Sequence, residues 1–383
     1  MDDDLIYVLG DQGDQPENPS QPPPKITIAP KSKDAVLNIL QNAVNRNASD
    51  IHLQVGSHPI IRIDGILSPF MAAKPVTSEF MNDCVNLFLN EKQKKTLSEE
   101  RQFDCSATLP NFIHRFRLNF FYQRNTLSCV LRANPVVPPT MEQLGIPPMM
   151  ENLAALPNGL VLITGATGSG KTTTLAAIVD HMNKHRNAHI ITLADPIEYI
   201  HKNKSCLISQ REIGDDATSF ASALRVVLRE DPDIIVVEEI RDLDTISMAL
   251  TAAETGHLVF ATLHTNDVVQ AIDRIIDIFP PHQQSQVRIQ MAMSLQAVVF
   301  QVLLKRKNTP GRIAVFEVMP VTTPIRHLIR NNQTVQIYNV IATSRAQGMI
   351  LRNDALRDYI QKDLISKEEA EEYFVDTAIF KTT

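Results

Sequence analysis

One octapeptide limits the possible folds of this chain more than any other feature. Residues 165–172 read Gly-Ala-Thr-Gly-Ser-Gly-Lys-Thr and match the pattern G-x-x-x-x-G-K-[ST] at every fixed position. An apolar strand-like run, residues 160–164, precedes this segment, and a helical pattern begins at Lys171. Glycines let successive backbone N–H groups turn toward phosphates, and a helix N-terminus adds positive potential. The segment therefore predicts a phosphate-binding loop inside an α/β fold.

The chemistry of this loop predicts which residues hold a nucleotide. The ammonium group of Lys171 is expected at the β- and γ-phosphates, and the hydroxyl of Thr172 at Mg²⁺. We predict ATP and Mg²⁺ as cofactors. The residues expected around the nucleotide are Gly165, Ala166, Thr167, Gly168, Ser169, Gly170, Lys171, Thr172 and Thr173.

Acidic residues follow two other apolar runs. Residues 234–237 are Ile-Ile-Val-Val, and Glu238 and Glu239 come directly after them. Ligands of open α/β sheets bind outside the carboxyl ends of the strands. We expect Glu239 to orient or deprotonate the attacking water and Glu238 to help hold the metal. Asp195 ends another such run and is a further metal candidate.

Two histidines flank the apolar run 258–263. His257 precedes the run and His264 follows it. A neutral imidazole can both donate and accept hydrogen bonds, so we expect both histidines to sense the γ-phosphate or to report its loss.

The order of patterns predicts the domain organisation. Residues 149–375 alternate apolar strands with helices, which indicates a parallel sheet covered on both faces, and the chain after about residue 284 is expected to be mostly helical. Residues 34–133 read as a smaller α+β domain, and residues 134–148, with five prolines, read as a linker. The Asp-, Asn- and Pro-rich segment 1–33 is expected to be a flexible tail or a docking segment, and 376–383 a second tail.

Composition excludes several other classes of protein. The net charge of −6 argues against a general nucleic-acid binder, and the four cysteines form no CxxC pair that would indicate a zinc ribbon. The N-terminus shows no secretory signal, and no apolar stretch reaches about 18 residues. We therefore expect no nucleic-acid partner, no integral membrane span and a cytoplasmic location.

Several segments together resemble the PilT/PilU-like retraction ATPases of type IV pili, a group within the type II/IV secretion ATPase superfamily. The segments are the phosphate loop and residues 48–53, 115–119, 195–201, 210–212, 228–233, 254–265 and 323–330. The resemblance implies a PAS-like N-terminal domain and a RecA-like ATPase domain. It also implies a homohexameric ring that drives a platform protein at the inner membrane, where the chain would be peripheral.

The resemblance also implies that arginines reach the nucleotide from the N-terminal domain of a neighbouring subunit. Arg117 and Arg132 match such positions, and Arg115, Arg124 and Arg229 are further candidates. An arginine at the γ-phosphate would stabilise charge in the transition state.

Two positions depart from the pattern of these ATPases. Ala194 stands where the group has a glutamate, and Glu238 stands where it usually has glycine. We expect Glu238 to replace the missing carboxylate in part; the alternative is a motor that hydrolyses ATP weakly and works beside an active paralogue.

Other functions remain open. They are an ATPase of a conjugative or type IV secretion system, a nucleotide sensor in a mixed ring, and a DNA translocase. The net negative charge of the chain argues against the last of these.

Overall fold

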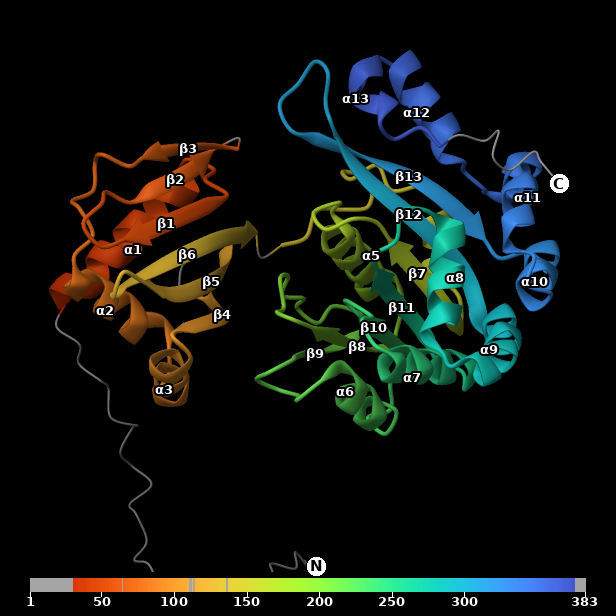
Figure 1. Ribbon diagram of the computed structural model, residues 1–383, viewed down its shortest axis with the longest axis horizontal. Helices are drawn as coiled ribbons and strands as arrows, with labels where there is room; N and C mark the ends of the chain where they lie inside the picture. Colours follow the sequence, from red (N-terminus) through yellow and green to blue (C-terminus); the bar gives the residue numbers. More distant parts are fainter. Residues whose placement is uncertain (1–29, 64, 110–111, 113, 136, 376–383) are drawn as a thin grey trace, which may run out of the picture.

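The computed structural model describes residues 30–63, 65–109, 112, 114–135 and 137–375, and they form two sheets (Figure 1). The tails expected at the two ends fall outside these residues, except that the first helix begins at residue 30. The elements of the N-terminal part are α1 (Pro30–Asn45), β1 (Asp50–Gln54), β2 (Ile60–Ile63), β3 (Ile66–Pro69), α2 (Ser78–Phe88), α3 (Glu91–Glu100), β4 (Gln102–Thr108), β5 (His114–Gln123) and β6 (Thr126–Pro135).

The N-terminal strands form an antiparallel sheet in the order β3-β2-β1-β6-β5-β4. The alternation of β5 gives this sheet two different faces. Phe116, Leu118 and Phe120 are fully buried in the core that includes α1 and α2. Arg115 and Arg117 alternate with them and therefore lie on the other face.

The second part contains the phosphate loop. Its elements are α4 (Met149–Ala154), β7 (Gly159–Thr164), α5 (Lys171–His185), β8 (His189–Ala194), β9 (Leu207–Glu212), α6 (Phe220–Val227), β10 (Ile234–Val237), α7 (Leu243–Glu254), β11 (Leu258–Leu263), α8 (Val268–Ile278), α9 (Pro281–Ser294), β12 (Leu295–Lys305), β13 (Arg312–Pro320), α10 (Thr323–Arg330), α11 (Ile337–Thr343), α12 (Arg352–Gln361) and α13 (Lys367–Glu371). Two short 3₁₀ turns, Thr334–Gln336 and Arg345–Gln347, lie between α10 and α12.

These strands form a seven-stranded sheet in the order β13-β12-β7-β11-β10-β8-β9, in which every pair is parallel except β12 with β13. The side chains of α4 and α5 pack in the core on one face, and those of α6 to α9 pack in the core on the other. The predicted parallel sheet is confirmed.

The expectation of a mostly helical chain after residue 284 holds for α9 to α13 but missed two long strands. β12 and β13 are an 11-residue and a 9-residue strand that extend the sheet beyond β7. Residues 297–304 are apolar except for Gln301, and such a run fits a buried strand and a buried helix equally well, because neither needs a polar face.

The segment that joins the two parts lies partly in the core of the second. Met141 and Ile146 are both buried against the cluster that contains β7 and α5. The second half of this segment therefore moves with the sheet that carries the phosphate loop.

Candidate nucleotide site

Four neighbouring strands of the parallel sheet end at one cavity of about 720 Å³. The phosphate loop follows β7, His264 follows β11, Glu238 and Glu239 follow β10, and Asp195 follows β8. The cavity is lined by Arg117, Arg132, Asn134, Thr167, Gly168, Gly170, Lys171, Thr172, Thr173, Asp195, Glu198, Phe220, Glu238, Glu239, Arg241, Thr262, His264, Leu303 and Arg312. The carboxyl edge of the sheet thus brings together segments that are far apart in the sequence.

The phosphate loop is folded around the side chain of Lys171. Its Nζ donates hydrogen bonds to the carbonyl oxygens of Gly165 (2.8 Å) and Ala166 (3.0 Å). Burial lowers the pKa of this ammonium group, although the nearby carboxylate of Glu239 opposes the shift. Gly168 and Gly170 have φ values of +78° and +88°, which only glycine adopts without strain.

A glutamine of β12 supports this loop from behind. Gln301 is 2 % exposed; its Nε2 donates to the carbonyl oxygen of Ser169 at 2.8 Å, and its Oε1 accepts from the hydroxyl of Thr174 at 2.7 Å. A Cβ atom on Gly165 would lie 2.3 Å from the backbone oxygen of Gln301. The loop is therefore packed tightly against β12.

Glu239 is held between two basic side chains. Arg241 contacts its Oε2 at 2.6 Å, and His264 Nε2 contacts its Oε1 at 3.0 Å. The hydrogen bond from Arg241 lowers the pKa of Glu239 against the opposing effect of burial. His264 Nδ1 lies 3.4 Å from Lys171 Nζ, so the imidazole lies between the carboxylate and the phosphate loop.

The position of Glu238 relates directly to Ala194. In the parallel pair of β10 and β8, Val237 lies opposite Leu193, and the amide of Glu238 donates to the carbonyl oxygen of Leu193 at 2.9 Å. Continuing this register by one residue places Glu238 beside Ala194. Burial raises the pKa of Glu238 well above its usual range, and the negative charges of Glu198 and Asp195 raise it further.

The N-terminal sheet supplies the opposite wall of the cavity. Arg117 of β5 lies directly across from Arg132 of β6, and both line the cavity. Asp50 of β1 accepts a hydrogen bond from Arg132 Nε at 3.0 Å. Burial raises the pKa of Asp50, but hydrogen bonds from Ser49 and Arg132 outweigh this effect, so that the pKa is lowered overall. The arginines that we expected from a neighbouring subunit are thus placed here by the same chain.

The structure does not bring every predicted residue into the cavity. His257 precedes β11 and therefore lies at the opposite edge of the sheet, where its Nδ1 is 3.0 Å from the carbonyl oxygen of Ala252. The strand between the two histidines has six residues, about 20 Å of extended backbone. A γ-phosphate in this cavity would not contact His257, so this part of the prediction was wrong for the single chain. Gly165, Ala166 and Ser169 belong to the loop but do not line the cavity, and Arg115 forms an ion pair elsewhere.

Some site residues were missed by sequence reasoning. Gln301 was missed because nothing in its local sequence indicates that β12 lies beside β7. Arg241 and Glu198 lie within three residues of Glu239 and Asp195, which were predicted site residues. This proximity in the sequence could have assigned both of them to the site. Glu198 lines the cavity, and burial raises its pKa although Arg117 and Arg132 oppose the shift.

The residues present fit a nucleotide with a divalent cation. The cavity combines ammonium and guanidinium groups with carboxylates and the Thr172 hydroxyl, the donor set that phosphates and Mg²⁺ require. The fold and the site define a P-loop nucleotide-binding protein with a RecA-like core.

Comparison with known proteins places this chain within a group. The family model described as "Type II/IV secretion system protein" matches residues 28–371, and the chain belongs to that family. It is 43 % identical over 337 residues to the type IV pilus retractation ATPase PilT of Pseudomonas aeruginosa, covering 88 % of this chain and 97 % of the relative. It is 37 % identical to the type IV pilus ATPase PilU of the same organism, covering 87 % and 86 %.

Solved structures agree with this assignment. The pilus retraction motor PilT with bound ADP is similar with a TM-score of 0.84 at 41 % identity, covering 90 % of this chain and 98 % of that one. The Legionella pneumophila ATPase DotB is similar with a TM-score of 0.76 at 26 % identity, covering 91 % and 97 %. These findings confirm the resemblance to PilT/PilU-like ATPases and the predicted fold class.

Proposed function

We propose that this chain is an ATPase that couples ATP hydrolysis to mechanical work on a type IV pilus, as a retraction-type motor. The observation that carries the proposal is the cavity in which Lys171, Glu239 and His264 face Arg117 and Arg132. The similarity to PilT and PilU over most of the chain supports the choice of pilus machinery.

The residues of the cavity divide the work of phosphoryl transfer. Lys171 and the amides of the loop bind the phosphates. Glu239, kept ionised by Arg241, orients the attacking water and accepts its proton. Arg117 and Arg132 stabilise the charge that develops on the transferred group.

Other residues at the carboxyl edge of the parallel sheet are placed to bind the metal and to sense the γ-phosphate. Thr172, Glu238, Glu239 and Asp195 would hold Mg²⁺, which neutralises phosphate charge when it is bound. His264 contacts both Glu239 and Lys171, so it is placed to respond when the γ-phosphate leaves.

The first test is ATP turnover by the purified full-length protein. We expect Mg²⁺-dependent hydrolysis that is lost in Lys171→Ala and in Glu239→Gln, while Glu239→Gln still binds ATP. Wild-type protein that binds ATP and does not hydrolyse it would refute the ATPase proposal.

We also propose that Glu238 replaces the carboxylate that is missing at Ala194. The register that places the two side by side supports this exchange, because a carboxylate on either strand would reach the same part of the cavity. Glu238→Gly should lower turnover at least tenfold, and the double variant Glu238→Gly with Ala194→Glu should restore it. Unchanged turnover in Glu238→Gly would contradict the exchange.

The assembly and its location follow from the same proposal. We propose a homohexameric ring that acts on a platform protein at the inner membrane; it would be peripheral there. Among the described residues, no helix has the length and apolar character to cross a bilayer. Mass measurement of the purified protein with and without nucleotide tests the ring.

Two alternatives have an observation in their favour. Similarity to DotB supports an ATPase of a secretion system. Ala194 supports a weakly hydrolysing subunit that works beside an active paralogue. Expression in a bacterium that lacks its own pilus-retraction ATPase separates them: restored twitching supports the retraction motor, turnover without twitching favours secretion, and restoration only together with a paralogue favours the accessory subunit.

A further inference from the structure

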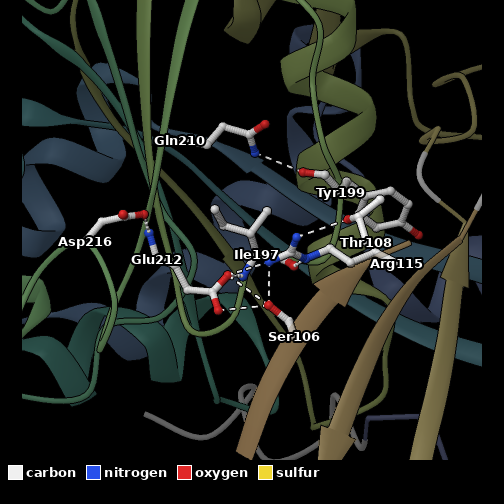
Figure 2. Close-up of polar contacts among 8 residues, drawn as sticks. All are labelled: Ser106, Thr108, Arg115, Ile197, Tyr199, Gln210, Glu212 and Asp216. Atoms are coloured by element: carbon white, nitrogen blue, oxygen red, sulfur yellow. Dashed lines mark hydrogen bonds and ion pairs between the residues drawn. The ribbon is translucent and has the colours of Figure 1, made fainter. Parts of the chain in front are cut away.

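An ion pair joins the N-terminal sheet to the motor domain outside the nucleotide cavity (Figure 2). Arg115 Nη2 of β5 contacts Glu212 Oε2, at the end of β9, at 2.7 Å. The hydroxyl of Ser106 on β4 also donates to the same carboxylate, at 2.8 Å and 3.1 Å. Glu212 is 8 % exposed, so this contact is largely shielded from water.

The same carboxylate holds the loop that follows β8. The amide of Ile197 donates to Glu212 Oε2 at 3.1 Å, and the carbonyl oxygen of Ile197 accepts from Arg115 Nε at 2.6 Å (Figure 2). Asp195 and Glu198, on either side of this residue, line the nucleotide cavity. Glu212 therefore joins three segments: the N-terminal sheet, the loop 195–198 and β9.

The position of Arg115 on its strand connects this contact to the nucleotide site. Arg115 and Arg117 are two residues apart on β5 and share one face, about 7 Å apart along the strand. Arg117 lies directly opposite Arg132. Arg115 does not line the cavity, whereas the other two arginines do. An anchor at Arg115 thus fixes the part of the sheet that presents both cavity arginines.

A buried ion pair is a poor source of net stability, because desolvation of the two charges offsets their attraction. The pair does fix the orientation of Arg115, because its Nε donates to the carbonyl oxygen of Ile197 and its Nη2 contacts the carboxylate of Glu212. We propose that Arg115 and Glu212 are positioning residues, which hold Arg117 and Arg132 over the phosphate site and keep the loop 195–198 in register with them. This inference rests on the proposed ATPase function of the cavity.

The test compares variants of the anchor with a matched ion pair. Arg115→Met and Glu212→Gln remove the anchor; Arg211→Met is the control, because Arg211 precedes Glu212 on β9 and pairs with Glu230 at 2.9 Å within the motor domain. We expect kcat for ATP to fall about 10- to 100-fold in the two anchor variants and less than twofold in the control. ADP affinity should stay within about twofold of wild type in all three, which also shows that each variant is folded.

A second measurement separates positioning from general damage. In the Arg117→Ala, Arg132→Ala background, adding Arg115→Met should reduce kcat by less than twofold, because the groups that it positions are already absent. If Arg115→Met lowered kcat in this background by the same factor as in the wild-type chain, the proposal would be overturned. An unchanged kcat in Arg115→Met on the wild-type chain would also overturn it.

The two proposals fail in different ways. Turnover that is insensitive to Lys171→Ala or to the Arg117→Ala, Arg132→Ala pair would refute the proposed function of the cavity. If the wild type does not turn over, the ratio of ADP to ATP dissociation constants replaces kcat as the readout. We then expect Arg115→Met to lower this ratio about tenfold or more, and an unchanged ratio would overturn the positioning role.

Discussion

Gln301 offers a direct test of how the phosphate loop is held. Its amide bridges the carbonyl oxygen of Ser169 and the hydroxyl of Thr174, at either side of the loop's exit into α5. Gln301→Met keeps the length of the side chain and removes both the donor and the acceptor. The substitution therefore changes the support of the loop and leaves every residue that lines the cavity in place.

The size of the effect follows from burial. Ser169 is 5 % exposed and Thr174 is 1 % exposed, so water does not readily replace the two lost partners. A buried polar group without a partner costs about 1–3 kcal/mol, which gives roughly 2–6 kcal/mol for the pair. For a domain of this size we expect the melting temperature to fall by roughly 4–24 °C. Rearrangement of the loop to recover hydrogen bonds would weaken nucleotide affinity about tenfold or more, since 1.4 kcal/mol corresponds to a factor of ten.

The assay is ADP titration together with thermal unfolding, each with and without nucleotide. Gln296→Met is a matched control: this residue lies on the same strand β12 and its Oε1 accepts from Arg326 at 2.9 Å, far from the loop. The control should lose some stability and keep wild-type ADP affinity. Gln301→Met with unchanged ADP affinity would refute the idea that β12 holds the loop in its binding conformation.

Three further predictions concern single groups. Gly165→Ala should abolish nucleotide binding, because the new Cβ would lie 2.3 Å from a backbone oxygen of β12; ADP titration showing wild-type affinity would contradict this. Burial raises the pKa of Glu317 to about 7, so the folded state holds a proton that the unfolded state releases near pH 4.5. The free energy of unfolding of the wild type, relative to that of Glu317→Gln, should therefore fall between pH 4.5 and pH 7, by at most about 1.4 kcal/mol per pH unit. Denaturant titrations at several pH values measure this difference, and a difference that does not change with pH would contradict the prediction. Arg241→Met should raise the pKa of Glu239 and shift the acid limb of the kcat profile to higher pH; an unshifted limb would show that this carboxylate is not the base.

The parts of the fold that the sequence could predict are those with local signals. The run 160–164, the glycine-rich loop and the helix at Lys171 are contiguous, so each supports the assignment of the next. β12 and β13 could not be assigned this way, because the run 297–304, apolar except for Gln301, shows no clear period. The two strands pair with each other, but β12 joins the sheet through β7, more than 130 residues earlier. Only the tertiary pairing decides that this segment is a strand.

The residues of the site also divide into those with a local sequence signal and those that depend on tertiary contacts. Glu238, Glu239 and His264 were predicted because each follows an apolar strand, and the ends of parallel strands meet at one edge. The same rule excludes His257, which precedes its strand, and applying it strictly would have avoided that error. Gln301 and the pairing of Arg115 with Glu212 depend on which strands and domains meet, which no local pattern in the sequence encodes.

The facing pair of arginines on the N-terminal sheet has a consequence for the energetics of the cycle. Like charges directly opposite each other on neighbouring strands repel, and Arg117 and Arg132 occupy such a position. Asp50 offsets this repulsion through its ion pair with Arg132, and a polyphosphate between the two arginines would add a counterion that both share. Part of the free energy of nucleotide binding would then come from relief of the remaining repulsion within one small sheet. Inorganic anions should imitate this relief, so sulfate should raise the melting temperature of the wild-type chain more than that of the Arg117→Ala, Arg132→Ala variant; an equal rise in both would reflect only the general stabilising effect of sulfate.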